Sequence, residues 1–129
     1  MHEPDHSQTD AFLGYNVVET QVQVSTAILD ELFPVLQKEY RFSRPFLKMD
    51  TQGHDLHVVG GASRCLSRFV GLQSELSVTP IYKGGCDFAE ALELYRRRGF
   101  RLTALVPNNC GHFPDLNEID CVMYNSEFK

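Results

Sequence analysis

The sequence predicts an α/β fold with three layers, in which helices cover a mostly parallel sheet. Two observations carry this prediction: segments with strand periodicity alternate with helical segments of about three turns, and two consecutive strands close the chain. A length of 129 residues with 43% hydrophobic residues suits one domain and excludes a two-domain enzyme. We expect residues 1–16 to be a flexible lead-in and residues 17–129 to form the folded part.

The first half of the folded part should contain two strands and two helices. Valines alternate with polar residues over 18–25, which predicts a strand. Apolar residues at helical spacing predict a helix over 28–40, kinked or split at Pro34 because proline lacks a backbone N–H. The short apolar segment 45–50 is typical of a buried strand that ends in a turn, and a weak helix over 53–62 should follow.

The second half contains the clearest element of the chain. A strand is predicted over 70–76, and a helix is predicted over 88–98 because every local signal there agrees. Asp87 can cap its first turn, and Gly99 can end it in a left-handed conformation. The two closing strands are expected over 100–106 and 119–124.

Charge and hydropathy exclude several classes of function. A net charge of −5 argues against a nucleic-acid binder, because neutralising phosphates takes a concentration of Lys and Arg. The basic run at residues 96–98 is explained by the C-terminus of the predicted helix, whose dipole favours cations. No apolar run approaches the roughly 18 to 20 residues that span a bilayer, and the polar start is unlike a signal peptide. We therefore expect a cytoplasmic protein with reduced cysteines, without nucleic-acid or membrane partners.

Common catalytic signatures are missing from the sequence. It contains no Gly-x-Ser-x-Gly elbow, no phosphate-binding P-loop and no Gly-x-Gly-x-x-Gly fingerprint. A metal site is one interpretation of Asp50, His54, Asp55 and His57, and it would suit a small metal-dependent hydrolase. Their spacing matches no known ligand motif, so we rank this interpretation last and expect no metal.

The positions of two carboxylates carry more information. Asp50 follows one predicted strand, with Gln52 and Gly53 directly after it, and Glu75 stands near the end of the next strand. Ligands of open parallel sheets bind outside the carboxyl ends of the strands, so both side chains would face one crevice if the strands are neighbours. The alternative is that Asp50 caps the following helix and Glu75 has a backbone or arginine partner.

Residues 46–62, FLKMDTQGHDLHVVGGA, resemble the central motif of the FkbM-type methyltransferases. That family has a Leu-Lys-hydrophobic-Asp strand, a polar pair ending in Gly, an acidic residue two positions on and a hydrophobic-x-Gly-Ala close. The resemblance covers about residues 22 to 125. Further matches in family order are LDEL at 29–32, QSEL at 73–76, PIY at 80–82, GF at 99–100 and IDCV at 119–122.

This resemblance implies an S-adenosylmethionine-dependent methyltransferase with a Rossmann-like class I fold, whose last two strands form an antiparallel pair at one edge. The implied reaction is O-methylation of a small molecule or sugar. By the match, Asp50, Gln52 and Gly53 are the first candidates for binding cofactor or substrate. Asp50, His54 and Glu75 are the candidates for catalysis, in which a carboxylate or imidazole would ease proton loss.

The sequence also departs from the family pattern. Family members begin with a strand leading to a glycine-rich turn for the cofactor, then a strand ending in an acidic residue for the ribose, and neither is found here. We therefore expect residues 17–129 to be the C-terminal part of a methyltransferase domain, a fragment with weak or no cofactor binding by itself. An exposed sheet edge would favour self-association. The alternative function is a non-catalytic α/β interaction module derived from a methyltransferase.

Overall fold

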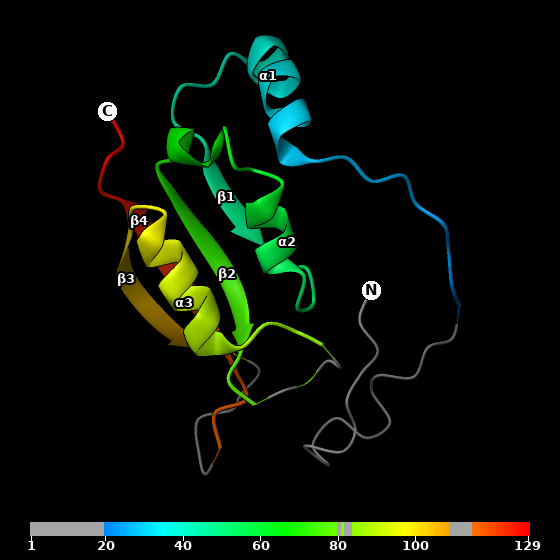
Figure 1. Cartoon of the computed structure of the whole chain (residues 1–129), viewed down its shortest axis with the longest axis vertical. Coiled ribbons are helices and arrows are strands. Elements are labelled where there is room, and N and C mark those ends of the chain that lie inside the picture. The colour runs from blue at the N-terminus through cyan, green and yellow to red at the C-terminus, as the bar shows by residue number, and fades with distance from the viewer. Residues whose placement is uncertain (1–19, 80, 82–83, 109–114) are drawn as a thin grey trace.

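The structure is a computed structural model that describes residues 20–79, 81, 84–108 and 115–129. Helices and strands alternate along most of it, which confirms an α/β fold (Figure 1). The expected lead-in at residues 1–16 lies outside the described residues. The elements are α1 (Leu29–Tyr40), β1 (Phe46–Met49), α2 (Asp55–Gly60), the 3-10 helix η2 (Leu66–Arg68), β2 (Gly71–Ser77), α3 (Phe88–Arg97), β3 (Phe100–Pro107) and β4 (Glu118–Asn125).

The described strands form one sheet in the order β1-β2-β4-β3. β1 pairs with β2 in parallel, whereas β4 pairs antiparallel with both β2 and β3. The expectation of a mostly parallel sheet is therefore wrong for this part of the chain. The closing pair is antiparallel as expected, but β4 returns between β2 and β3, so it adds a second antiparallel neighbour.

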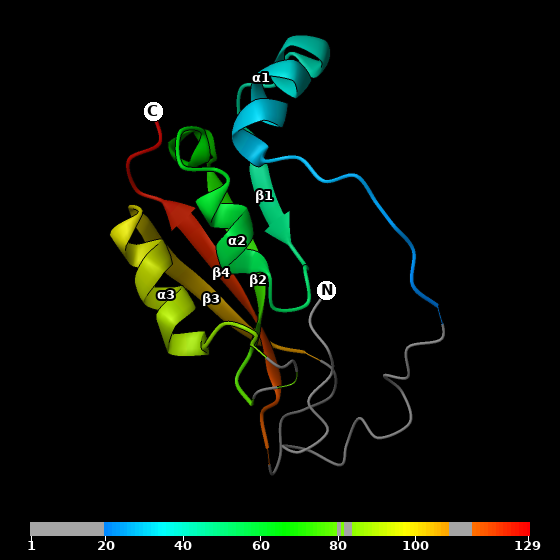
Figure 2. The same cartoon turned by 45° about the vertical axis from the view of Figure 1, so that its right-hand side comes forward.

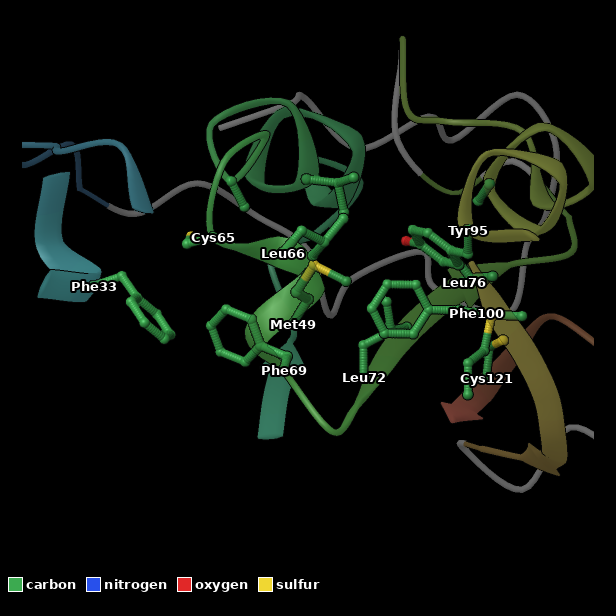
Figure 3. Packing of buried hydrophobic residues seen from close by; sticks show 14 of the residues in the cluster. Phe33, Met49, Cys65, Leu66, Phe69, Leu72, Leu76, Tyr95, Phe100 and Cys121 are labelled. Atoms are coloured by element: carbon green, nitrogen blue, oxygen red, sulfur yellow. The ribbon is translucent and has the colours of Figure 1, made fainter. Parts of the chain in front are cut away.

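The core lies on the face of the sheet that α2 and α3 share (Figure 2). Leu72 and Leu76 of β2 and Cys121 of β4 point to this face and are almost completely buried (Figure 3). Tyr95 of α3 covers them and is itself buried. Because residues alternate along a strand, Glu75 lies on the opposite face. The described elements thus place hydrophobic packing on one face and the predicted catalytic carboxylate on the other.

Helix α1 is continuous through Pro34, so the expected split does not occur. The helix lies beyond the N-terminal end of β1 (Figure 1) and is held there by contacts of its own. Phe33 packs edge-on against the rings of Phe42 and Phe69, at centroid distances of 5.6 and 5.2 Å. The carboxylate of Asp30 accepts hydrogen bonds from the chain segment before η2. These tertiary contacts stabilise the helix despite the lost proline N–H.

The strand expected over 18–25 is wrong for residues 20–25, and residues 18 and 19 lie outside the described part. The segment belongs to no strand, and Val22 and Val24 are 77% and 75% exposed. The predicted buried strand at 45–50 exists as β1, but Phe46 is 49% exposed. Phe46 lies on the same face of β1 as the exposed Lys48, opposite to the buried Met49. Within the described residues β1 pairs only with β2, so its other edge is open.

Helix α3 confirms the local signals read from the sequence. The carboxylate of Asp87 accepts hydrogen bonds from the backbone N–H groups of Ala89 and Glu90, at 2.8 and 3.1 Å. Gly99 follows the helix with a φ of 88°, the left-handed conformation expected of it. In the described part of the chain, no helix is long and apolar enough to cross a membrane.

Candidate active site at the carboxyl ends of β1 and β2

The site begins where β1 ends. Met49 is buried, and the four residues that follow it, 50–53, form a turn before α2. Gln52 and Gly53 both have positive φ, 52° and 88°. Such a conformation is ordinary for glycine but uncommon for glutamine, so the surrounding contacts must hold the turn in place. The turn thus presents the Asp50 side chain at the carboxyl end of the strand.

The register of β1 against β2 brings the two predicted carboxylates together. Met49 is aligned with Ser74, so the next residues along the two parallel strands, Asp50 and Glu75, become neighbours. The two carboxyl groups interact closely enough for each to shift the pKa of the other. They lie at the same edge of the sheet, as expected, but Glu75 lines one hollow and Asp50 lines another, so the expectation of a single crevice is not confirmed.

Further side chains complete this pair. The ammonium of Lys48 lies 3.0 Å from the Asp50 carboxylate, and the Gln52 amide donates to its other oxygen at 3.3 Å. The amide of Asn108, from the end of β3, donates to the Glu75 carboxyl. The alternative roles are therefore not observed: the N-cap of α2 is His54 rather than Asp50, and Glu75 interacts with the side chains of Asn108 and Asp50 rather than with an arginine.

The surroundings of the two carboxyl groups shift their pKa values in opposite directions. Burial, followed by the charge of Glu118 and the hydrogen bond with Asp50, raises the pKa of Glu75 from 4.5 to about 7. The hydrogen bond from Lys48 lowers the pKa of Asp50, and the same contact raises the pKa of Lys48. Near neutral pH the pair therefore holds roughly one proton on Glu75 beside an ionised Asp50. A carboxyl group that titrates near pH 7 is suited to general base catalysis.

Two hollows meet at this turn. The smaller, which we call the β2 hollow, has a volume of about 160 Å³, and its lining includes Gly53, Glu75, Ser77 and Cys86. The larger, which we call the β1–α2 groove, has a volume of about 980 Å³. Its polar wall includes Asp50, Gln52 and His54, and its apolar wall includes Val22, Val24, Ile28 and Leu32. The turn 50–53 therefore separates a small hollow with a mixed polar and apolar lining from a larger and mostly apolar groove.

The other residues that the sequence suggested, His54, Asp55 and His57, do not line the β2 hollow with Glu75. His54 lines the β1–α2 groove, where its ring lies 5.3 Å from that of His57, centroid to centroid. Asp55 points the other way, into the core, and is only 1% exposed. Among residues 20–79, 81, 84–108 and 115–129, no group of three His, Cys, Asp or Glu side chains is arranged to hold a metal ion.

Sequence reasoning missed three residues of the site. Asn108 could not be predicted because its approach to Glu75 depends on the return of β3. Lys48 could have been selected, because it lies two residues before Asp50 and strand alternation puts both side chains on one face. Ser74 could have been identified from the sequence. It is a polar residue at a core-facing position of β2, where its neighbours on the same face are Leu72 and Leu76. A buried polar group requires a partner, and here the partner is Asp55.

Comparison with known proteins identifies the family of the chain. The model of the methyltransferase FkbM domain family matches residues 2–102, which is more than half of the chain. That range includes the turn 50–53 and both carboxylates. No curated protein and no solved structure matches the chain. The chain therefore belongs to the FkbM methyltransferase family.

Proposed function

We propose that this chain contributes the acceptor side of an S-adenosylmethionine-dependent methyltransferase that methylates a hydroxyl of a small molecule or sugar. The observation that carries the proposal is the Asp50–Glu75 pair at the carboxyl ends of two parallel strands. Glu75 has a pKa of about 7 and lines the β2 hollow, so it can accept a proton from a group held there. Membership of the family supplies the reaction class.

In the proposed mechanism the acceptor hydroxyl enters the β2 hollow and donates a hydrogen bond to Glu75. S-adenosylmethionine, when bound, supplies an electrophilic methyl group on sulfur. With the cofactor bound, its carbon–sulfur bond would break as the acceptor oxygen takes the methyl group, and sulfur would keep the electron pair. Glu75 takes the hydroxyl proton, and Asp50 stabilises the protonated form by accepting a hydrogen bond from it. Lys48 keeps Asp50 ionised, so that Asp50 remains an acceptor.

The β1–α2 groove fits a ligand the size of a nucleoside. Its volume of about 980 Å³ is at the upper end of the roughly 300 to 1,000 Å³ of small-molecule pockets. Asp50 and Gln52 would hold polar groups of the cofactor, while the valines of segment 20–28 offer an apolar wall. Gly53, which lines the adjoining β2 hollow, would allow close approach of the backbone there. His54 lies on the polar wall of the groove and is our second candidate for proton transfer.

The sequence lacks the glycine-rich turn and the acidic strand end that the family uses for the cofactor. We infer that residues 17–129 correspond to the C-terminal part of a three-layer, Rossmann-like domain, and that this chain alone binds S-adenosylmethionine weakly. Isothermal titration of residues 1–129 tests this inference. Affinity in the micromolar range would overturn the partial-domain assignment.

Transfer of a radiolabelled methyl group from S-adenosylmethionine tests the reaction itself. The chain is incubated at high cofactor concentration with hydroxylated small molecules and sugars. We expect a labelled ether that disappears with Glu75→Gln and persists with Glu39→Gln, an exposed change on α1. Absence of product with every acceptor at saturating cofactor would overturn the proposal.

The open edge of β1 favours one second candidate, a non-catalytic interaction module. Phe46 of β1 exposes much of its apolar surface, and so do Val22, Val24 and Ile28 in the segment before α1. Unpaired strand edges beside apolar residues favour association with another chain. Self-association through this edge, with no methyl transfer, would support the second candidate over the first.

A further inference from the structure

Asp55 is a buried carboxyl group that the proposed mechanism does not use. It is the first residue of α2 and only 1% exposed. A buried carboxyl group is costly unless hydrogen bonds replace the lost water. One of its oxygens accepts from the backbone N–H of Thr51, at 3.3 Å, and from the Thr51 hydroxyl. Its other oxygen accepts from the Ser74 hydroxyl.

Ser74 continues this network to α3. Its oxygen lies 2.8 Å from the hydroxyl of Tyr95. Because the Ser74 proton is donated to Asp55, Tyr95 donates to Ser74. Tyr95 is fully buried, and burial raises its pKa, so the hydroxyl keeps its proton. The network therefore links the turn 50–53, α2, β2 and α3 through defined donors.

The turn is held from both faces of the sheet by consecutive residues of β2. On the core face, Ser74 and Asp55 hold Thr51. On the opposite face, Glu75 holds Asp50. Gln52, the next residue of the turn, has the positive φ that persists in a non-glycine residue only where its surroundings enforce it. A hydrogen bond from the His54 N–H to the Thr51 carbonyl, at 3.2 Å, closes the turn across Gln52, and the contacts of Asp55 hold Thr51 at one end of this closure.

We propose that Asp55 is a positioning residue: by holding Thr51 from the core side, it sets where Asp50 and Gln52 stand relative to Glu75. This inference rests on the proposed function, because it gives the turn 50–53 a catalytic purpose. The inference goes beyond the proposed function because it assigns a role to Asp55, Ser74 and Tyr95. None of these three residues lines the β2 hollow or the β1–α2 groove.

The experiment measures the titration of Glu75 by carbon-detected NMR of its side-chain carboxyl in the whole chain. Asp55→Ala removes the carboxylate oxygen that accepts hydrogen bonds from the Thr51 N–H and hydroxyl. The turn should then relax, and Asp50 should move away from Glu75. We expect the apparent pKa of Glu75 to change by at least about half a unit. Asp55→Asn keeps an acceptor for Thr51 and should restore most of the original value.

Two further variants keep the test decisive if Asp55→Ala does not fold. Thr51→Val preserves the shape of the side chain but removes the hydroxyl donor, and it should shift Glu75 in the same sense as Asp55→Ala. Val59→Ala is the matched control, because Val59 is a buried residue of the same helix that packs in the hydrophobic core and has no side-chain hydrogen-bonding group. We expect it to lower stability and leave the Glu75 titration unchanged.

An unchanged Glu75 titration in Thr51→Val and in folded Asp55→Ala would overturn the inference, and so would an equal shift in Val59→Ala. The NMR readout needs no enzymatic activity, which separates this inference from the proposed function. A shift of Glu75 without any methyl transfer would refute the methyltransferase proposal and leave the positioning role intact. Methyl transfer that survives Asp55→Ala at full rate would refute the positioning role alone.

Discussion

Ionisation of Glu75 should weaken the fold as the pH rises from about 4.5 to about 7. In the folded chain burial, the Glu118 charge and the hydrogen bond with Asp50 raise the pKa of Glu75 from 4.5 to about 7. In the unfolded chain the carboxyl group returns to its ordinary pKa. Between these two values the folded chain binds more protons than the unfolded chain, so the free energy of unfolding falls as the pH rises.

The size of this effect follows from the shift. A change in pKa from 4.5 to about 7 corresponds to at most ~3 kcal/mol. Glu75 is only partly buried, and solvent screening reduces the expected loss to about 1–2 kcal/mol. Asp50 acts in the opposite sense, because its pKa is lowered from 3.8, and its contribution is lost only below that window.

Urea denaturation at several pH values from about 4.5 to about 7.5 measures this dependence. Histidines titrate in the same range, so the informative quantity is the difference between wild type and Glu75→Gln. We expect the variant, which cannot ionise at this position, to lose less stability across the window. Glu39→Gln, an exposed change on α1, should follow the wild type. Equal losses of stability in wild type and Glu75→Gln would refute the reasoning.

Three further predictions concern the fold. Leu72→Ala should lower the free energy of unfolding by about 2–5 kcal/mol, because Leu72 is completely buried; Leu105→Ala, at a 39% exposed residue, should cost clearly less, and equal losses would contradict the assignment of the core. Asp87→Ala should cost about 0.5–2 kcal/mol in denaturant, because α3 loses its N-cap, and no loss would contradict the capping role. The wild type should associate with rising concentration in size-exclusion chromatography with light scattering, and Phe46→Lys should reduce this; a wild type that stays monomeric at every concentration refutes association through the β1 edge.

Local signals in the sequence were enough for the elements that depend on near neighbours. Asp87, the apolar stripe and Gly99 define α3 within a dozen positions, and the structure has the helix in that place. The ends of β1 and β2 were also predictable, because strand periodicity stops there. Asp50 and Glu75 could therefore be selected as candidates before their contact was known.

Long-range pairing explains what the sequence could not predict. The alternating valines of segment 20–25 have strand propensity, yet a strand forms only where another strand supplies hydrogen-bond partners. The position of β4 between β2 and β3 could not be predicted either, because periodicity contains no information on strand order. The lack of this information also made β1 appear buried, although one of its edges is open in the described structure.

The sequence by itself determined the α/β class, the helix α3, the family and the two carboxylates at strand ends. Only the tertiary structure decided that these carboxyl groups are neighbours on paired strands, that Lys48 and Asn108 contact them, and that Asp55 contacts the turn from the core. The physical reason is distance along the chain: helix caps and periodicity act within a few residues, whereas the pKa of Glu75 depends on groups from several strands. Strand register and burial bring those groups together, and neither can be predicted from the sequence of one segment alone.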